Sequence, residues 1–359
     1  MDLTKLSDEE LLELKEKKTV QMNKHDLAQG AMKVALNSLY GCMGNQYFVF
    51  YATAMAEAIT VTGQYFIRTV ANYVNDWLQS ITDKNDDYRL GGDTDSVFFN
   101  INTVIEKFMP DASFDEQLDK IVEFADTKMQ EKIEETIKEI CDSINAFEPG
   151  ALKMAREMVC DAAILVAKKK YTFSIVDDEG NRLVNKKHKI TGLESKKAII
   201  SSDIRDKLKE AYWVCLHNDD SELIKFVSDF KKEFENFDVD MIAQITGVNG
   251  IEEYVNKTKG VPYHVKAAIS HNNYIKKIGI EDIVNPIQSG SKIKIINLKI
   301  PNPTMKELFA YEGDWKEEFG LCEYVDRNLQ FEKSFKEPLK NLTEAIEYAI
   351  EPKQTYDIF

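Results

Sequence analysis

A short β-prone stretch, residues 88–101, separates segments that follow the spacing of helices. It reads Tyr-Arg-Leu, then a Gly/Asp-rich turn at 91–95, then Ser-Val-Phe-Phe-Asn-Ile. This order predicts a β-hairpin with acidic residues at its tip. Helices are predicted over 52–78 before the hairpin and over 114–145 after it. The sequence therefore predicts an α+β protein.

The N-terminal region is predicted to form a helical hairpin. Ser7 followed by Glu10 is a capping-box pair, so a solvated amphipathic helix is expected over 7–18. A second helix is expected over 20–40. It should stop at Gly41 and Gly44, where continuing a helix becomes costly.

Strand and helix signals alternate beyond residue 145. Strands are predicted over 158–166 and 171–176, and a turn at 177–181 leads to further β-prone residues at 183–184. Two helices are predicted within 202–237, separated at 217–220, and another over 267–277. The Ile/Lys alternation of 292–300 predicts an exposed strand that ends at Pro301. A last helix is predicted over 339–350.

Composition limits the class of protein. With 359 residues, 43% of them hydrophobic, the chain can bury a core and should divide into two or three domains. Its formal charge of −15 means that any nucleic-acid contact must be local. Five widely spaced cysteines without a C-x-x-C pair indicate neither a disulfide framework nor a zinc site. No apolar run reaches the ~20 residues that span a bilayer, and no signal peptide is evident. These features indicate an intracellular, cytoplasmic protein with no membrane partner.

Asp93 and Asp95 are the first candidates for chemistry. An isolated D-x-D is more often an ordinary turn, because Asp tolerates turn geometry and bonds its own backbone. At a hairpin tip, however, side chains two residues apart in a strand lean to the same face. Two carboxylates there could converge on one Mg²⁺ ion. The pair therefore suggests phosphoryl transfer.

Lys33, Asn37 and Tyr40 are spaced i, i+4 and i+7, so they should share one face of the second helix. They could present a cation, an amide and a phenol to one ligand. A solvated lysine beside a core tyrosine is the alternative, and spacing alone favours it.

One stretch is basic in an otherwise acidic chain. Residues 168–207 hold 11 Lys/Arg and 6 Asp/Glu, a local charge of 11 − 6 = +5. A charge run is usually a solvated face. Here the sign is opposite to that of the rest of the chain, as contact with a phosphate backbone requires.

Three strings, taken in order, resemble motifs of family B DNA polymerases, most closely those of T-even-type bacteriophages. They are KVALNSLYG at 33–41, GGDTDS at 91–96 and KKKY at 168–171. They correspond to motif B (K-x-x-x-N-S-x-Y-G), motif C (D-T-D-S) and the palm K-K-x-Y motif. The similarity extends to 62–64, 190–194, 262–265 and the aromatic C-terminus. Each string is weak alone, but the ordered set is specific.

The resemblance implies roles at the reaction centre. Asp95 would be the motif C metal ligand and Asp93 a second carboxylate beside two Mg²⁺ ions. Lys33 would take part in catalysis by contacting the incoming dNTP, and Asn37 would line the same nucleotide-binding face. Tyr40 would lie under the nascent base pair. The implied activity is template-directed DNA synthesis.

The resemblance also implies a DNA contact. Lys168, Lys169 and Tyr171 would hold the primer-template DNA near its minor groove. Lys170 replaces the usual arginine, so it offers a point charge in place of a bidentate contact. Glu157 stands where relatives carry an acid near the palm site.

Parts of a complete family B enzyme have no counterpart in these residues. The chain lacks a D-x-x-S-L-Y-P string (motif A), the exonuclease and the arginine of the first fingers helix. The resemblance then implies domains at 1–45 (second half of the fingers), 46–192 (palm), 193–351 (thumb) and 352–359 (tail). We expect a separate N-terminal subunit to supply motif A and the exonuclease, and this chain to be inactive alone. The initial Met and family-like end favour a natural subunit of a split polymerase, although a cloned fragment would look the same.

The C-terminal residues Tyr356, Ile358 and Phe359 resemble the clamp-binding peptide of T-even-type polymerases. The alternative is that they fold back onto the thumb. For the whole chain, the alternatives are a non-catalytic DNA- or clamp-binding protein derived from a polymerase, and an unrelated Mg²⁺-dependent phosphotransferase. The second alternative leaves Tyr40 and the basic stretch unexplained.

Overall fold

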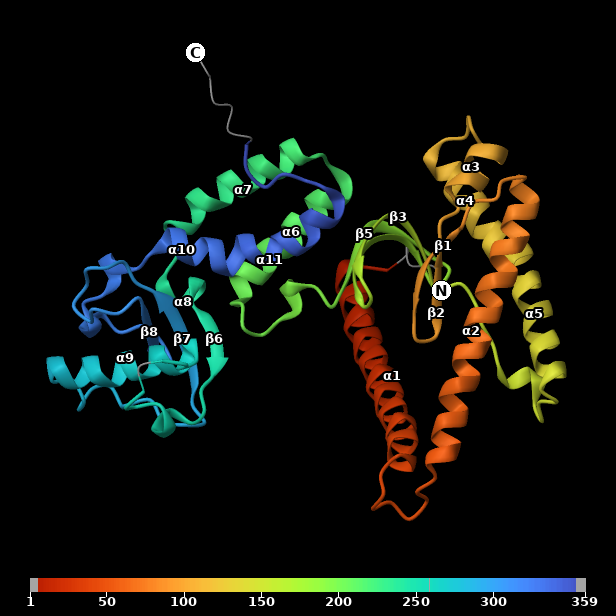
Figure 1. Ribbon diagram of the computed structural model, residues 1–359. Coiled ribbons are helices and arrows are strands. Elements are labelled where there is room, and N and C mark those ends of the chain that lie inside the picture. Colours follow the sequence, from red (N-terminus) through yellow and green to blue (C-terminus); the bar gives the residue numbers. More distant parts are fainter. Residues whose placement is uncertain (1–5, 258, 353–359) are drawn as a thin grey trace. The chain divides into compact units, whose positions relative to one another are not determined.

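The computed structural model describes residues 6–257 and 259–352 (Figure 1). The chain divides into two compact units, Met1–Ala155 and Arg156–Phe359. Helices and small antiparallel sheets occur in both units, which confirms the predicted α+β class. The division falls inside the expected palm, and the domain boundaries given above stay predictions.

The first unit begins with one continuous helix, α1 (Asp8–Met43). The capping box of Ser7 and Glu10 is confirmed, with Ser7 N–H 2.9 Å from a Glu10 carboxylate oxygen. The predicted break near residue 19 is wrong. No Gly or Pro lies there, and the Thr19 hydroxyl donates within the helix to the Lys15 carbonyl, 2.8 Å away. The helix continues through Gly41 and ends at Met43, with Gly44, one of the two predicted stop residues, as its C-cap.

The rest of the first unit packs on α2 (Thr53–Thr82). Buried Val70, Val74 and Leu78 of α2 cluster with Ile137 and Ile140 of α5. The predicted hairpin is confirmed as an antiparallel pair of strands. The remaining elements are β1 (Arg89–Asp93), β2 (Ser96–Phe99), α3 (Asn102–Phe108), α4 (Phe114–Phe124), the π-helix η2 (Ala125–Met129) and α5 (Gln130–Ser143). The predicted helix over 114–145 is thus one helical run with a π-bulge.

The second unit begins with an antiparallel sheet in the order β3–β4–β5. Its strands are β3 (Met158–Ala167), β4 (Lys170–Asp178) and β5 (Asn181–Thr191), and the last is much longer than predicted. The central strand β4 is buried over most of its length. Helix α6 (Ser202–His217) contacts β3 and β4.

An aromatic core holds the helices of the second unit together. Phe230 and Phe234 of α7 (Asp220–Phe234) pack against Phe331 and Phe335. These last two belong to one helical run made of α10 (Arg327–Phe331), the π-helix η8 (Glu332–Lys336) and α11 (Glu337–Thr343). The run starts earlier than the predicted helix over 339–350, because its apolar positions before residue 339 are also buried in this core. Its α-helical part ends at Thr343, and the 3₁₀ turn η9 (Glu344–Ile346) follows.

A second sheet has the order β6–β7–β8, with strands β6 (Gln244–Gly247), β7 (Lys292–Asn297) and β8 (Leu308–Tyr311). Helix α9 (Tyr263–Ile278) packs on it. The prediction that β7 is exposed is wrong. It is the central strand, Ile293 and Ile295 are buried, and the Lys294 ammonium lies 2.6 Å from the Asp240 carboxylate. That ion pair lets a lysine occupy a central strand.

The remaining elements are short. They are the helix α8 (Val239–Ile242) and the 3₁₀ turns η3 (Pro149–Ala151), η4 (Glu194–Lys196), η5 (Ile251–Glu253), η6 (Glu317–Phe319), η7 (Cys322–Tyr324) and η9 (Glu344–Ile346). In the part of the chain that the structure describes, every helix is too short or too polar to cross a membrane.

Candidate functional site

The acidic pair lies at the tip of the β1–β2 hairpin. Asp93 ends β1 and pairs with Ser96, the first residue of β2, so Thr94 and Asp95 form a two-residue turn. The Asp95 N–H donates to the Asp93 carbonyl at an N···O distance of 2.7 Å, as in a γ-turn. Thr94 sits at φ 59°, an unusual conformation for a β-branched residue. Backbone strain of this kind concentrates at functional sites.

Neighbouring groups hold this turn in place. The Thr94 hydroxyl donates to an Asp93 carboxylate oxygen at 3.1 Å, and the Ser96 hydroxyl donates to the Asp93 carbonyl at 3.2 Å. Gly92 is needed because a Cβ atom there would lie 2.5 Å from the Ser96 carbonyl oxygen. The two strands can therefore approach closely only with glycine at this position.

The turn, and not strand alternation, sets the direction of Asp95, because Asp95 lies outside both strands. Asp95 is exposed and Asp93 is partly buried. Two carboxylates on a held, solvent-accessible turn are suitable oxygen ligands for Mg²⁺. Within residues 6–257 and 259–352, no three His, Cys, Asp or Glu side chains gather to hold a metal. The acidic turn, Asp93–Ser96, therefore offers two carboxylates, and their role as metal ligands stays a prediction.

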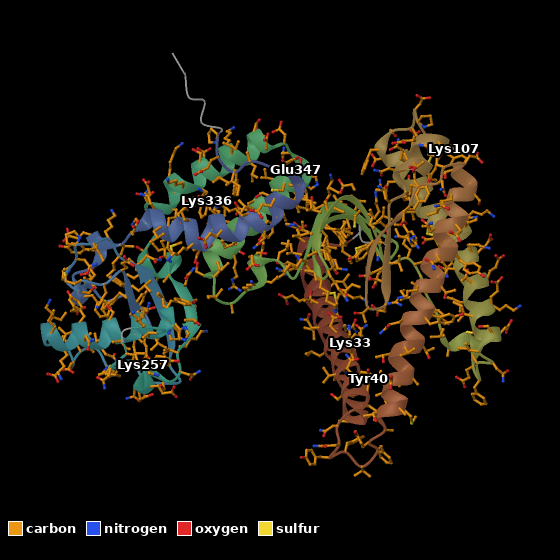
Figure 2. The ribbon with its side chains drawn as sticks, in the orientation of Figure 1. Lys33, Tyr40, Lys107, Lys257, Lys336 and Glu347 are labelled. Atoms are coloured by element: carbon orange, nitrogen blue, oxygen red, sulfur yellow. The ribbon has the colours of Figure 1, made fainter. Side chains whose placement is uncertain are left out.

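Lys33, Asn37 and Tyr40 all lie on α1, where Figure 2 labels the lysine and the tyrosine. All three side chains are exposed, and Tyr40 keeps 40% of its surface accessible. The structure therefore excludes the alternative of a buried core tyrosine within this chain. A cation, an amide and a phenol remain available along one helix.

The third group of candidates lies in the second unit. Lys168 and Lys169 form the turn between β3 and β4, and both are exposed. Lys170 begins β4, and its ammonium lies 3.9 Å from Glu194. Tyr171 is buried and its ring stacks on Phe173, with centroids 4.7 Å apart. Its ring packs in the sheet, and its contact with DNA stays a prediction.

Many lysines downstream of this turn are paired with acids. Lys186 lies 2.6 Å from Asp161, Lys187 2.5 Å from Asp178, Lys189 2.9 Å from Glu157 and Lys197 2.5 Å from Glu194. Asp178 and Glu194 were already counted in the local charge of +5, whereas Asp161 and Glu157 lie outside residues 168–207 and lower that excess of positive charge through their ion pairs at the sheet. Lys168 and Lys169, called the lysine turn below, are exposed.

Two residues near the lysine turn had no role in the sequence analysis. They are Gly192 and Glu194, which appeared there only within the similar stretch 190–194. Both follow β5, and their relation to the turn depends on the pairing of β4 with β5. Strand register cannot be read from the local sequence, so no sequence signal indicated their role. The tail residues Tyr356, Ile358 and Phe359 lie outside the described residues.

The sequence of the chain matches known proteins over most of its length. Residues 9–237, more than half of the chain, match the sequence model of DNA polymerase family B. The DNA-directed DNA polymerase of Enterobacteria phage T4 is 28% identical over 344 residues, which cover 90% of this chain and 38% of that protein. That of Escherichia phage RB69 is 27% identical over 351 residues, covering 92% and 38%.

An archaeal protein is also similar. DNA polymerase 1 of Sulfurisphaera ohwakuensis is 26% identical over 277 residues, or 76% of this chain and 27% of that protein. The chain thus spans less than half of the length of these relatives.

Proposed function

The chain belongs to DNA polymerase family B, and from this premise we propose that it takes part in template-directed DNA synthesis. The reaction would transfer a nucleotidyl group from a dNTP to a primer 3′-hydroxyl. The observation that carries the proposal is the strained acidic turn at Asp93–Ser96, which presents two carboxylates where the family's metal motif falls.

Asp95 and Asp93 would act as metal ligands. Family B polymerases use divalent metal ions. Mg²⁺, when bound, activates the 3′-hydroxyl and neutralises the triphosphate. The γ-turn and the Ser96 hydroxyl hold the backbone of the turn, and the Thr94 hydroxyl donates to the Asp93 carboxylate, so less reorganisation is needed when a ligand binds.

Helix α1 would bind the nucleotide. The ammonium of Lys33 can neutralise charge on the β- and γ-phosphates, a common task of lysine in phosphoryl transfer. Asn37 lies one turn further along and can donate to the same ligand, and Tyr40 offers an exposed ring for packing against the nascent base pair.

The lysine turn would bind the primer-template DNA. Lys168 and Lys169 are exposed at a hairpin tip, where their two ammonium groups are accessible to the phosphates of a duplex. Such contacts supply affinity that depends on salt and not on base sequence.

A second polypeptide would supply motif A and the exonuclease. Support comes from α1, which buries no residue over its 36 positions and exposes apolar side chains such as Leu27 (76%) and Met32 (71%). So many apolar side chains exposed along one helix favour an interface with another chain. We place the partner on this helix and on the aromatic segment 47–51, where Tyr47 and Phe50 are also exposed.

The C-terminal tail would bind a sliding clamp. Tyr356, Ile358 and Phe359 lie outside the described residues, so support comes from the sequence alone. An aromatic peptide that follows Pro352 can insert anchors into an apolar pocket, which is the usual composition of an interface hot spot.

A reconstitution experiment tests these assignments together. The chain is mixed with the polypeptide from the same genome that carries motif A and the exonuclease acids, and primer extension is measured with Mg²⁺. We expect extension only by the mixture. Asp95→Asn should lower kcat by about 10³-fold, or about 4 kcal/mol, while DNA affinity changes little. Asp111→Asn, which changes an exposed acid in the loop between α3 and α4, is the matched control.

Each component can fail separately. Extension by this chain alone, above the Asp95→Asn background, would remove the need for a partner. Near-normal turnover of Asp95→Asn in the mixture would overturn the role of the acidic turn. DNA binding without any extension by the mixture would favour the non-catalytic binding protein. A chain that lacks residues 354–359 should extend short primers normally but lose stimulation by the clamp, and equal stimulation would assign the tail to packing.

A further inference from the structure

The lysine turn is held in an uncommon backbone conformation. Ala167 of β3 pairs with Lys170 of β4, so Lys168 and Lys169 alone connect the two strands. Lys169 has φ 61°, in the left-handed region that residues with a Cβ atom rarely adopt. Closing a two-residue hairpin favours positive φ, and residues packed against the turn can favour this conformation further.

Gly192 is the residue that lies against the turn. It follows the pair Tyr171–Thr191, the last of β4 with β5, and has φ 63°. A Cβ atom at this position would lie 2.0 Å from the carbonyl oxygen of Lys169 and 3.1 Å from its carbonyl carbon. Both atoms are backbone, so no side-chain rotation can relieve the overlap. Only glycine permits this approach.

Glu194 holds the segment that contains Gly192 in place through ion pairs and a hydrogen bond. Its side chain is 11% exposed, and its carboxylate lies 2.5 Å from the Lys197 ammonium and 3.9 Å from that of Lys170. The Asn341 amide of α11 lies 3.5 Å away. The segment after β5 is thus fastened to the start of β4 and to a helix of the aromatic core.

We infer that Gly192 is a positioning residue for DNA binding: its close approach sets the conformation of the turn that carries Lys168 and Lys169. This inference rests on the proposed DNA contact of that turn. Two adjacent ammonium groups engage successive phosphates only if the backbone holds them in one geometry. A displaced turn would keep both charges but lose their alignment.

The matched comparison uses another glycine of the same sheet. Gly180, in the turn between β4 and β5, also has a positive φ of 82°, but a Cβ atom there meets nothing within 4 Å. Gly180→Ala therefore introduces the backbone strain without the overlap. Gly192→Asn introduces the overlap with less strain, because Asn tolerates the left-handed region better than Ala. Gly192→Ala introduces both.

Binding of a fluorescent primer-template to the full chain is measured by anisotropy over a range of salt concentrations. We expect Gly192→Ala and Gly192→Asn to weaken binding about tenfold and to flatten the log–log salt slope by about one to two units, roughly one for each phosphate that a lysine no longer neutralises. Gly180→Ala should bind like the wild type. Circular dichroism at the assay temperature confirms that each variant is folded.

A second measurement does not depend on DNA. Limited trypsin digestion, followed by mass spectrometry, reports the rate of cleavage after Lys168 and Lys169. We expect faster cleavage at this turn in both Gly192 variants and an unchanged rate in Gly180→Ala. Unchanged cleavage in both Gly192 variants would overturn the inference. If Gly192→Ala does not fold, Gly192→Asn decides.

The double variant Lys168→Ala/Lys169→Ala separates the two claims. If it weakens binding and the Gly192 variants do not, the DNA contact stands and the positioning role is wrong. If the double variant binds DNA like the wild type, the proposed DNA contact of Lys168 and Lys169 is wrong. The proposed role of Gly192 in positioning that contact is then wrong too.

Discussion

Helix α1 and the aromatic core of the second unit are both helical, but they are stabilised in opposite ways. None of the 36 residues of α1 is buried, and apolar side chains such as Val20 and Leu27 are mostly exposed. In the second unit, Phe230 (2% exposed) packs against the aromatic rings of Phe331 and Phe335. The first helix has apolar groups without a core, and the second unit has a complete core.

This difference indicates which part of the chain should fold without contacts from another molecule. Most helical stability in proteins comes from tertiary packing of an apolar face and not from helix propensity. The second unit therefore should fold on its own contacts. We expect α1 to depend on whatever covers it, which agrees with the proposed partner chain. Three pairs of substitutions test this difference between α1 and the second unit.

Matched phenylalanines should give the largest contrast. Phe335 is fully buried in the aromatic core, whereas Phe50, after α1, is 71% exposed. Phe335→Ala should lower the free energy of unfolding by about 3–5 kcal/mol, because it removes buried apolar surface and leaves a cavity. Phe50→Ala should change it by less than about 0.5 kcal/mol. Urea unfolding followed by tryptophan fluorescence measures both, and equal losses would remove the distinction.

Lowering the pH should have the second-largest effect, a loss of unfolding free energy that depends on His188 in the second unit. Burial, with nearby His217 and Lys196, lowers the pKa of His188 to about 4, and its Nε2 lies 2.8 Å from the Thr172 hydroxyl. In the unfolded chain, the imidazole of His188 takes up a proton near pH 6.5. The contribution of neutral His188 to the free energy of unfolding is therefore fully present above pH 6.5 and is lost as the pH falls toward 4.

Because His188 is partly exposed, the loss is discounted to roughly 1–2 kcal/mol. His188→Gln should flatten the fall in unfolding free energy between pH 6.5 and 5, whereas His25→Gln on exposed α1 should not. The same slope in both variants would contradict the assignment.

Removing one helix cap from each unit should give the smallest difference in unfolding free energy. The Asp219 side chain accepts from Glu222 N–H at 3.1 Å and caps α7, as Ser7 caps α1 by accepting from Glu10 N–H at 3.3 Å. Asp219→Ala should lower the unfolding free energy by about 1 kcal/mol. Ser7→Ala should reduce the helical circular-dichroism signal slightly and leave the urea midpoint unchanged. A shifted midpoint for Ser7→Ala would show that α1 unfolds together with a core.

Local elements and motifs could be predicted from the amino-acid sequence. Side-chain periodicity, turn residues and caps act within a few residues of the chain. They predicted the cap at Ser7, the hairpin at 88–101, the strands from residue 158 and the helix break at 217–220. The order of the three polymerase-like strings identified the family for the same reason. Functional motifs that depend only on residue type and spacing can be identified from the sequence.

The tertiary structure decided what is buried and what approaches closely. Alternating Ile and Lys made β7 look exposed, but strands on both sides and the Asp240 ion pair make it central. The basic stretch has a local charge of +5 in the sequence, but the structure pairs its Lys186 with Asp161 and its Lys189 with Glu157, two acids outside that stretch. The contact of Gly192 with Lys169 depends on strand register. Each of these outcomes arises from residues far apart in the chain, whose proximity only the packed fold creates.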